Sequence, residues 1–439
     1  MLLKTLPNFA NQQWLAAQLP VETENWLDGK KYAVRKCKSN YTKAKESVLA
    51  LLKTTEWKWP KRPVIFITDL HADANALTHS LLASGGIEIT NKGKNFKLTE
   101  FGKKALFIFG GDFFDKGPSN LELLRALHQL IKTGARVRLI AGNHDIRVLF
   151  GMRSVGQTDD PRNAHFFIRM GAKAVPFLQE IKEQYLTKTD LKNTPEQAQC
   201  ERMLYPQENW WQQFPQLATW VMPQVAIDRE MQKINKKVER FSHVCSQHQL
   251  TVREAYAAAI KWQQLFLQPD GEFYWFFKRL KLAHKTGSLL YVHAGLDDRT
   301  ATMLNEFGVS HINNSFKEQL NGSPFEFYYG PLANTIRTKY RVVDMPLTEV
   351  GTEQAHQAGI YAIMHGHRNL HHGQRIAIRK QLLHFECDVT LDINSRQKER
   401  LSGSGAGATL ITPQAEIIGI STDYKHIKVF QPEKIKQHG

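Results

Sequence analysis

The 439-residue sequence has few cysteines and no long apolar run. Its four cysteines are Cys37, Cys200, Cys245 and Cys387. They are widely spaced and form no C-x-x-C pair, which argues against a disulfide framework and favours reduced, buried thiols. No stretch of 18 apolar residues is present, so we expect no transmembrane helix.

The N-terminus also lacks the features of a cleaved secretory signal. An apolar core and a small-residue cleavage site are both missing, and polar residues such as Lys4, Asn8 and Asn11 interrupt the stretch from Met1 to Pro20. We therefore expect a cytoplasmic protein, or one that is exported without a cleaved signal peptide.

Acidic residues are outnumbered, because 58 Lys and Arg stand against 42 Asp and Glu and give a formal net charge of +16. The excess is uneven, with a basic stretch between Lys30 and Arg62. We interpret this stretch as a solvated helix face, and the alternative is steering of a polyanionic or phosphorylated partner. The sequence has no nucleic-acid-binding motif, so nucleic acid is not an expected partner, and nothing in it predicts an oligomeric state.

Five polar segments each follow a short apolar run of β-forming residues. They are Asp69-Leu70-His71, Gly111-Asp112-Phe113-Phe114-Asp115-Lys116-Gly117, Gly142-Asn143-His144-Asp145, Val292-His293-Ala294-Gly295 and His365-Gly366-His367. Runs of this length fit buried strands, and helical patterns follow two of them, near 71–84 and 118–133. Strands that alternate with helices predict an α/β sheet, in which ligands bind beyond the carboxyl ends of the strands. All five segments are expected at those ends.

These segments supply the ligands that a two-metal, phosphoester-cleaving site requires. Two divalent ions about 3.5–4 Å apart activate a water and clamp the phosphate, and a carboxylate can bridge ions held that close. Asp112 is the candidate bridge, and Asp69 and His71 can hold one ion together. The candidates for the other ion are Asn143, His293 and His367. Oxygen and nitrogen ligands without thiolate favour Mn, Fe or Zn.

The ordered set of segments resembles the calcineurin-like metallophosphoesterases. Within them it looks most similar to the phosphoprotein phosphatase branch, and there to the bacterial Shewanella-like phosphatases. The family pattern runs G-D-x-H-G-D, G-D-x-x-D-R-G, G-N-H-E, H-G-G and G-H-T, and the matching segments begin at Thr68, Gly111, Gly142, His293 and Gly366. The resemblance covers roughly 63–150 and 288–422. It leaves 1–60 and 151–287 unexplained.

The resemblance implies a role for each matching residue. Asp69, His71 and Asp112 would bind one metal, and Asp112, Asn143, His293 and His367 would bind the other. His144 would be the general acid that protonates the leaving oxygen, and Asp115 would orient His144. Asp145 is interpreted either as support for the site or as a helix cap.

The chain departs from the family pattern at the phosphate-binding positions. Lys116 replaces an arginine, and because arginine binds phosphate bidentately while lysine is a point charge, we expect phosphate binding to be looser or reshaped. The resemblance also predicts a phosphate-binding arginine within 330–341, where Arg337 is favoured over Arg341. His365 is an alternative ligand from the last segment, but we expect it to be only a neighbour of the metals.

The implied fold is a four-layer α/β/β/α metallophosphoesterase sandwich of α/β class. We expect a catalytic domain at 61–150 and 288–430, a mostly helical N-terminal extension at 1–60 and a helical cap insertion at 151–287. Apolar residues at helical spacing from Ile227 to Cys245 support the cap, as do five of the nine tryptophans. The alternative is a helical elaboration away from the site.

The implied activity is metal-dependent hydrolysis of phosphomonoesters by a hydroxide that bridges the metals, without a phosphoenzyme. The resemblance favours a phosphorylated protein as the substrate, with a small phosphoester as the other candidate. One alternative is a dinucleoside polyphosphate hydrolase, whose relatives share these motifs. The other is a non-catalytic binding scaffold on the same fold, which is disfavoured because this chain keeps every metal-binding group.

Overall fold

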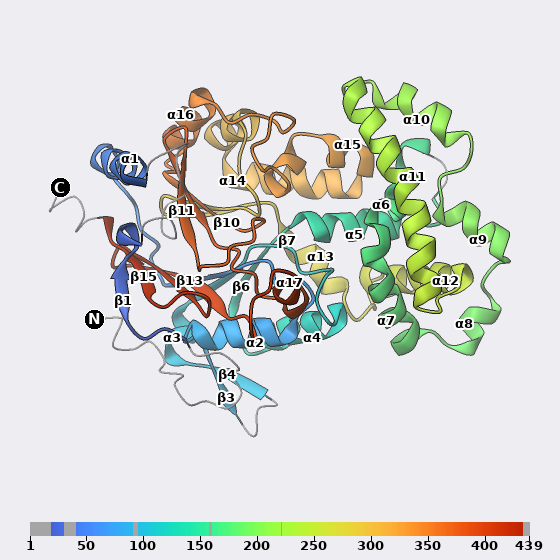
Figure 1. Cartoon of the computed structure of the whole chain (residues 1–439), viewed down its shortest axis with the longest axis horizontal. Coiled ribbons are helices and arrows are strands. Elements are labelled where there is room, and N and C mark those ends of the chain that lie inside the picture. Colours follow the sequence, from blue (N-terminus) through green and yellow to red (C-terminus); the bar gives the residue numbers. More distant parts are fainter. Residues whose placement is uncertain (1–18, 30–40, 91–94, 158–159, 221, 433–439) are drawn as a thin grey trace. The chain divides into compact units, whose positions relative to one another are not determined.

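The computed structural model describes residues 19–29, 41–90, 95–157, 160–220 and 222–432 (Figure 1). Its internal contacts divide the chain into two units. The first unit is Met1–Gly142, Leu280–Phe316 and Asn334–Gly439, and the second is Asn143–Arg279 and Lys317–Ala333. The second unit therefore begins earlier than the predicted cap and includes a later segment of the chain.

The larger sheet of the first unit has the strand order β1-β15-β14-β13-β2-β5-β6-β7. Its strands are β1 (Thr23–Asn25), β2 (Val64–Ile67), β5 (Leu106–Phe109), β6 (Arg136–Ile140), β7 (Leu280–Lys281), β13 (Gly407–Thr412), β14 (Glu416–Ser421) and β15 (Ile427–Phe430). Strands β2, β5 and β6 are parallel, whereas β13 pairs with β2 in antiparallel fashion. The apolar runs before Asp69, Asp112 and Asn143 are therefore neighbouring strands, as predicted.

The smaller sheet has the order β11-β12-β10-β9-β8. Its strands are β8 (His284–Thr286), β9 (Leu289–Tyr291), β10 (Ala362–His365), β11 (Arg375–Arg379) and β12 (Leu382–Glu386). The two sheets share one hydrophobic core, in which Phe66 and Ile108 of the larger sheet pack with Tyr291, Met364 and Phe385 of the smaller one. The rings of Phe66 and Tyr291 lie 5.5 Å apart between centroids.

Helices of the first unit cover the outer faces of the two sheets. Helices α2 (Ala74–Ala83) and α4 (Asn120–Lys132) connect parallel strands of the larger sheet and lie side by side (Figure 1). Helices α14 (Asp298–Asn321) and α16 (Glu349–Gln357) lie in the connection from β9 to the parallel strand β10. Since the shared core fills the inner faces, these crossover helices lie outside, which gives the predicted α/β/β/α layers.

Side-chain caps start the two helices that follow the first two polar segments. The Asp73 carboxylate accepts from the Ala76 N–H at the start of α2, and the Ser119 hydroxyl accepts from the Glu122 N–H at the start of α4. The remaining elements of this unit are α1 (Tyr41–Thr54), β3 (Ile87–Thr90), β4 (Asn95–Leu98), α3 (Glu100–Lys104) and α17 (Ile393–Lys398).

The described part of the second unit consists of helices and turns. Its helices are α5 (Asn143–Arg153), α6 (Phe166–Met170), α7 (Val175–Tyr185), α8 (Lys188–Lys192), α9 (Gln197–Leu204), α10 (Trp210–Ala218), α11 (Gln224–Gln247), α12 (Val252–Leu267), α13 (Tyr274–Arg279) and α15 (Pro324–Tyr329). The amphipathic helix predicted from the apolar spacing is α11, which buries Ile227, Ile234, Phe241 and Cys245. The last residues of the predicted insertion are not helical. They form β7 and β8, which belong to the first unit.

The described part of the N-terminal region packs onto the first unit. Trp26 and Trp57 are buried in the core between the sheets, and β1 pairs with β15. Residues 1–18 and Cys37 lie outside the described residues, whereas Cys200, Cys245 and Cys387 are free and buried. Among the described helices, none has the length and apolar character needed to cross a bilayer.

Candidate metal centre

The backbone brings the first two ligand segments together within the first unit. Beyond the ends of β2 and β5, the Asp69 N–H donates to the Gly111 carbonyl at 3.0 Å and the His71 N–H donates to the Asp112 carbonyl at 2.9 Å. These bonds continue the pairing of the two strands into their loops. As a result Asp69, His71 and Asp112 lie beside one another, and their role as ligands of one metal ion stays a prediction.

Several candidate ligands have a left-handed backbone, which is unusual for residues other than glycine. The φ angles are 57° at Asp69, 44° at His71, 57° at Asp112 and 67° at His367. Such conformations are costly, and they persist where the surrounding structure holds them, often at functional sites. The strain therefore gives an indication of function that does not depend on residue type.

Two motif glycines allow the loops to close around the carboxylates. A Cβ atom at Gly142 would collide with the backbone and carboxylate of Asp112, and one at Gly366 would collide with the Asp69 carboxylate. The Asp69 carboxylate also accepts from the backbone N–H of His367, at 3.0 Å. This hydrogen bond connects the segment of His367 to the segment of Asp69.

Three histidines each use one ring nitrogen to hold a backbone carbonyl. Nδ1 of His71 donates to the Phe114 carbonyl at 3.2 Å, and Nδ1 of His293 donates to the Gly110 carbonyl at 2.8 Å. Nε2 of His367 donates to the Arg337 carbonyl at 3.2 Å. Because a carbonyl oxygen can only accept, the nitrogen on the other side of each ring is the atom that could bind a metal ion when the ring is neutral. Metal-binding histidines are usually oriented in this way.

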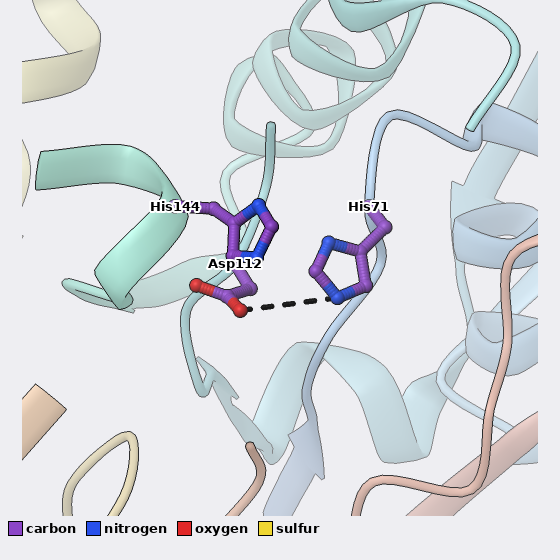
Figure 2. Close-up of side chains that lie close together, drawn as sticks. All are labelled: His71, Asp112 and His144. Atoms are coloured by element: carbon purple, nitrogen blue, oxygen red, sulfur yellow. Dashed lines mark ion pairs between the residues drawn. The ribbon is translucent and has the colours of Figure 1, made fainter. Parts of the chain in front are cut away.

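The other ring nitrogens of these histidines gather around Asp112. Nε2 of His71 lies 3.8 Å from the Asp112 carboxylate and 3.8 Å from that of Asp69, and Nε2 of His293 lies 3.4 Å from Asp112 (Figure 2 shows the pair of His71 and Asp112). One ligand atom from each of Asp112, His293 and His367 lies within 4.8 Å of the others. Asp112 is therefore shared by two groups of ligands, which fits a divalent ion on each side.

Buried negative charge favours a cation at this position. Burial and the neighbouring Asp112 carboxylate, opposed by His293, raise the pKa of Asp69 above its ordinary value. Burial lowers the pKa of His293, but the Asp112 and Asp69 carboxylates outweigh it and raise that pKa to about 10. A bound divalent ion would supply the compensating charge, and the mixed oxygen and nitrogen donors suit such an ion.

Asn143 and His144 are the first two residues of the second unit and of α5. Gly142, the residue of the first unit that precedes α5, lies against Asp112. Within the second unit, Nη2 of Arg147 lies 2.7 Å from Nδ1 of His144. Because a guanidinium only donates, Nδ1 of His144 accepts, and the ring hydrogen is on Nε2.

Arg147 is a residue that the sequence analysis missed. Its position three residues after His144 on a helix was the available signal, since such residues lie on one face. Asp115 is buried, and its backbone N–H donates to the Asn120 side chain at 3.0 Å. The predicted orienting role of Asp115 stays a prediction, as does the choice between support and capping for Asp145, which is fully buried in the first turn of α5.

The two predicted phosphate-binding residues have different surroundings. Nζ of Lys116 lies 2.6 Å from Nε2 of His71, inside the centre. The Arg337 backbone contacts His367, whereas Arg341 is exposed and pairs with Asp344 at 3.2 Å. The backbone of Arg337 therefore lies next to a candidate ligand, and phosphate binding by Arg337 stays a prediction.

His365 and Asp388 are two further buried residues of the first unit. His365 contacts the Gly366 carbonyl and the ring of His384, and burial lowers its pKa to about 3, which agrees with a neighbouring role. Asp388 was missed, although it directly follows β12 as Asp112 follows β5. Burial and the Asp69 carboxylate raise the pKa of Asp388 well above its ordinary value, and Lys116 opposes them.

Residues 62–240 match the family model described as calcineurin-like phosphoesterase. The chain contains a calcineurin-like phosphoesterase domain. The match includes the segments from Asp69 to Asp145 and ends before His293 and His367, which the structure brings to the same centre. This match supports phosphoester hydrolysis as the activity of the domain.

No curated protein matches the sequence. Solved structures that match include a cold-active protein tyrosine phosphatase (15% identity, TM-score 0.44, covering 84% of this chain and 78% of that one). A cold-active protein-tyrosine phosphatase of a psychrophilic Shewanella species has 14% identity, a TM-score of 0.41 and coverage of 84% and 80%. A Saccharomyces cerevisiae protein serine/threonine phosphatase with similarity to human phosphatase PP5 has 12% identity, a TM-score of 0.39 and coverage of 88% and 87%. These similarities are too low to bear on the substrate.

Proposed function

We propose that this chain is a phosphatase that hydrolyses phosphomonoesters, and that its substrate is a phosphorylated protein. The observation that carries the proposal is the position of Asp112 between His71 on one side and His293 and His367 on the other. A carboxylate shared by two groups of imidazole ligands can bridge two ions. A structural ion pair would not need three histidines oriented by backbone carbonyls.

Each side of Asp112 would hold one divalent ion, Mn, Fe or Zn. Asp69 and His71 are the ligands on one side, and Asn143, His293 and His367 are the ligands on the other. When bound, two such ions supply an activated water and neutralise the phosphoryl oxygens. The fixed histidine rings mean that little rearrangement is needed before an ion can bind.

The other residues would act on the phosphate and on the leaving group. Lys116 and Arg337 are the cations available to bind the phosphoryl oxygens. His144 carries its hydrogen on Nε2 and can donate from that atom to the leaving oxygen, with Asp115 as its predicted orienting partner. Arg147 fixes the other nitrogen of His144 and so sets which atom donates.

A phosphorylated protein is the substrate that the motif pattern favours. The pattern from G-D-x-H to G-H-x resembles the phosphoprotein phosphatase branch, and Asn369 stands where other metallophosphoesterases have a further metal-binding histidine. This is an argument by analogy to a family and not by site geometry. A small phosphoester is the other candidate.

The test is a substrate screen on chelator-treated protein that is reloaded with Mn²⁺, Fe²⁺ or Zn²⁺. We expect metal-dependent release of phosphate from phosphopeptides that carry phosphoserine, phosphothreonine or phosphotyrosine, and from an aryl phosphate. Faster turnover of diadenosine tetraphosphate than of any phosphopeptide would favour a dinucleoside polyphosphate hydrolase instead. Tight metal binding without hydrolysis of any substrate would favour the scaffold.

A further inference from the structure

The segment 334–340 lies before α16 in the chain and forms hydrogen bonds with the backbone that follows His293. The N–H groups of Ala294 and Gly295 both donate to the Thr335 carbonyl, at 2.8 and 3.2 Å. A carbonyl oxygen has two lone pairs, so this one atom can accept both bonds. The segment thus fixes the main chain at the two residues directly after a candidate ligand.

Tyr340, at the end of the segment, adds a side-chain contact to the same stretch of backbone. Its hydroxyl accepts from the Leu296 N–H at 3.1 Å. A Cβ atom at Gly295 would collide with this hydroxyl, so only glycine lets Tyr340 approach so closely. Tyr340 also has a φ angle of 57°, a costly conformation that persists where the surrounding structure holds it. Both observations indicate that the fold fixes Tyr340 against this stretch.

Asn334, at the start of the segment, connects it to Asp297, which follows Leu296. The Asn334 side-chain N–H donates to the Asp297 carboxylate at 2.7 Å, and both residues are buried. The carboxylate also accepts from the Thr300 N–H in the first turn of α14, at 2.8 Å. The carbonyl of Asn334 in turn accepts from the Arg337 N–H at 3.2 Å. Asn334 therefore links the start of a helix to the turn that carries Arg337.

The same segment contacts a second candidate ligand, His367. Nε2 of His367 donates to the Arg337 carbonyl at 3.2 Å. The rings of His293 and His367 lie 5.0 Å apart between centroids, and each offers one nitrogen to the group that they form with Asp112. Metal–ligand distances tolerate deviations of only about 0.2 Å, so a shift of either ring would weaken metal binding. One segment therefore constrains two candidate ligands of the same ion.

We propose that Asn334 and Tyr340 are positioning residues that fix His293 and His367 for the binding of a divalent ion. This inference rests on the proposed function, because it concerns the same metal centre. Neither residue is itself a ligand, and both act through the segment that they begin and end. Loss of the Asn334 carboxamide removes a donor from the buried Asp297 carboxylate and lets the segment shift, and both histidines shift with it.

The experiment compares Asn334→Ala with Asn313→Ala in the full-length chain, by Mn²⁺ calorimetry and by the midpoint of thermal unfolding. Asn313 is the matched control, because it is buried in the same unit and its side chain also bonds to backbone, accepting from the Leu282 N–H at 2.9 Å. Both variants lose buried hydrogen bonds and should have a lower midpoint. Only Asn334→Ala should also bind Mn²⁺ more weakly, by about 10-fold, the lower end of the range for residues that orient metal ligands.

Tyr340→Phe is a milder second variant, which keeps the ring and removes only the acceptor of the Leu296 N–H. It should weaken Mn²⁺ binding in the same direction, and it decides the question if Asn334→Ala does not fold. Wild-type affinity in Tyr340→Phe would overturn the inference, and so would an affinity in Asn334→Ala no weaker than in Asn313→Ala; either result leaves the proposed function in place. Absence of Mn²⁺ binding by wild type would overturn the proposed function and this inference with it.

Discussion

The tautomers of the histidines decide what each ring can do in the centre. His71 and His293 hold a carbonyl with Nδ1 and offer Nε2, whereas His367 holds one with Nε2 and offers Nδ1. His144 differs, since its Nδ1 accepts from Arg147. Each of the first three rings thus has one nitrogen on a backbone carbonyl and the other toward the candidate centre, whereas His144 carries its hydrogen on Nε2.

Replacing His144 with asparagine tests its role as a donor. We expect a loss of about 10²–10⁴-fold in kcat on an alkyl phosphate, where the leaving oxygen must be protonated in the transition state. The loss should be smaller on an aryl phosphate with an acidic phenol. His248→Asn, at an exposed position of the same unit, is the control and should leave both rates unchanged. Equal losses on the two substrates would show that His144 positions the substrate instead.

The positions of the candidate ligands were easier to predict from the sequence than those of their neighbours. The candidates are close to the ends of recognisable apolar strands, and they are Asp69, His71, Asp112, His293 and His367. Arg147 and the contact of Lys116 with His71 could not be found, since both depend on the direction of a long side chain. Asp388 also follows an apolar strand, β12, as Asp112 follows β5. It belongs to no segment of the family pattern, and the sequence analysis therefore missed it.

At the scale of elements, the segments that follow β2, β5, β9 and β10 form the candidate centre within the first unit. Their strained backbone and their glycines let two carboxylates, His71 and His367 approach one another. The strands themselves are short and buried, so the loops begin from fixed points. The strands therefore fix the points at which the loops begin, and the loops carry the candidate ligands.

Gly366→Ala tests whether this close approach is needed. The new Cβ atom would collide with the Asp69 carboxylate, so we expect weaker Mn²⁺ binding, measured by calorimetry, with the folded structure retained by circular dichroism. Gly322→Ala is the control, because a Cβ atom there would make only ordinary contacts, the nearest at 3.5 Å. Wild-type Mn²⁺ affinity in Gly366→Ala would show that Asp69 does not need its present position.

Elements with a strong periodic pattern were predictable, and short polar strands were not. Helices α2, α4 and α11 and the five strands before the ligand segments follow from their apolar spacing. Strand β1, with the sequence Thr-Glu-Asn, and β8, with His-Lys-Thr, have no such spacing. They are strands because β15 and β9 pair with them, and tertiary pairing of this kind overrides local preference.

At the scale of the whole molecule, the second unit has its own aromatic core and an exposed apolar group. Trp210 is buried at 1% exposure among Phe214, Trp211 and His165. Trp220 is 91% exposed. The sequence indicated that neighbouring tryptophans 210 and 211 could not both face one core, but it did not show which tryptophan of the unit would be exposed.

Trp220→Ala tests whether the second unit selects the substrate. If it contacts a phosphopeptide, the variant should lower kcat/KM for the peptide and leave the rate on a small aryl phosphate unchanged. Trp210→Ala is the structural comparison, and removal of this buried ring should lower the free energy of unfolding by about 3–5 kcal/mol. Equal turnover of both substrates by wild type and Trp220→Ala would make Trp220 irrelevant to selection.

The central claim is that Asp112 is shared by two bound metal ions, and the metal content of Asp112→Asn tests it most directly. Each variant is loaded with Mn²⁺, dialysed and measured by mass spectrometry for metal per chain, with Asp270→Asn as an exposed control. We predict that Asp112→Asn loses more metal than Asp69→Asn, His71→Asn, His293→Asn or His367→Asn, and that it abolishes hydrolysis. Near wild-type metal content and rate in Asp112→Asn would contradict the two-metal assignment.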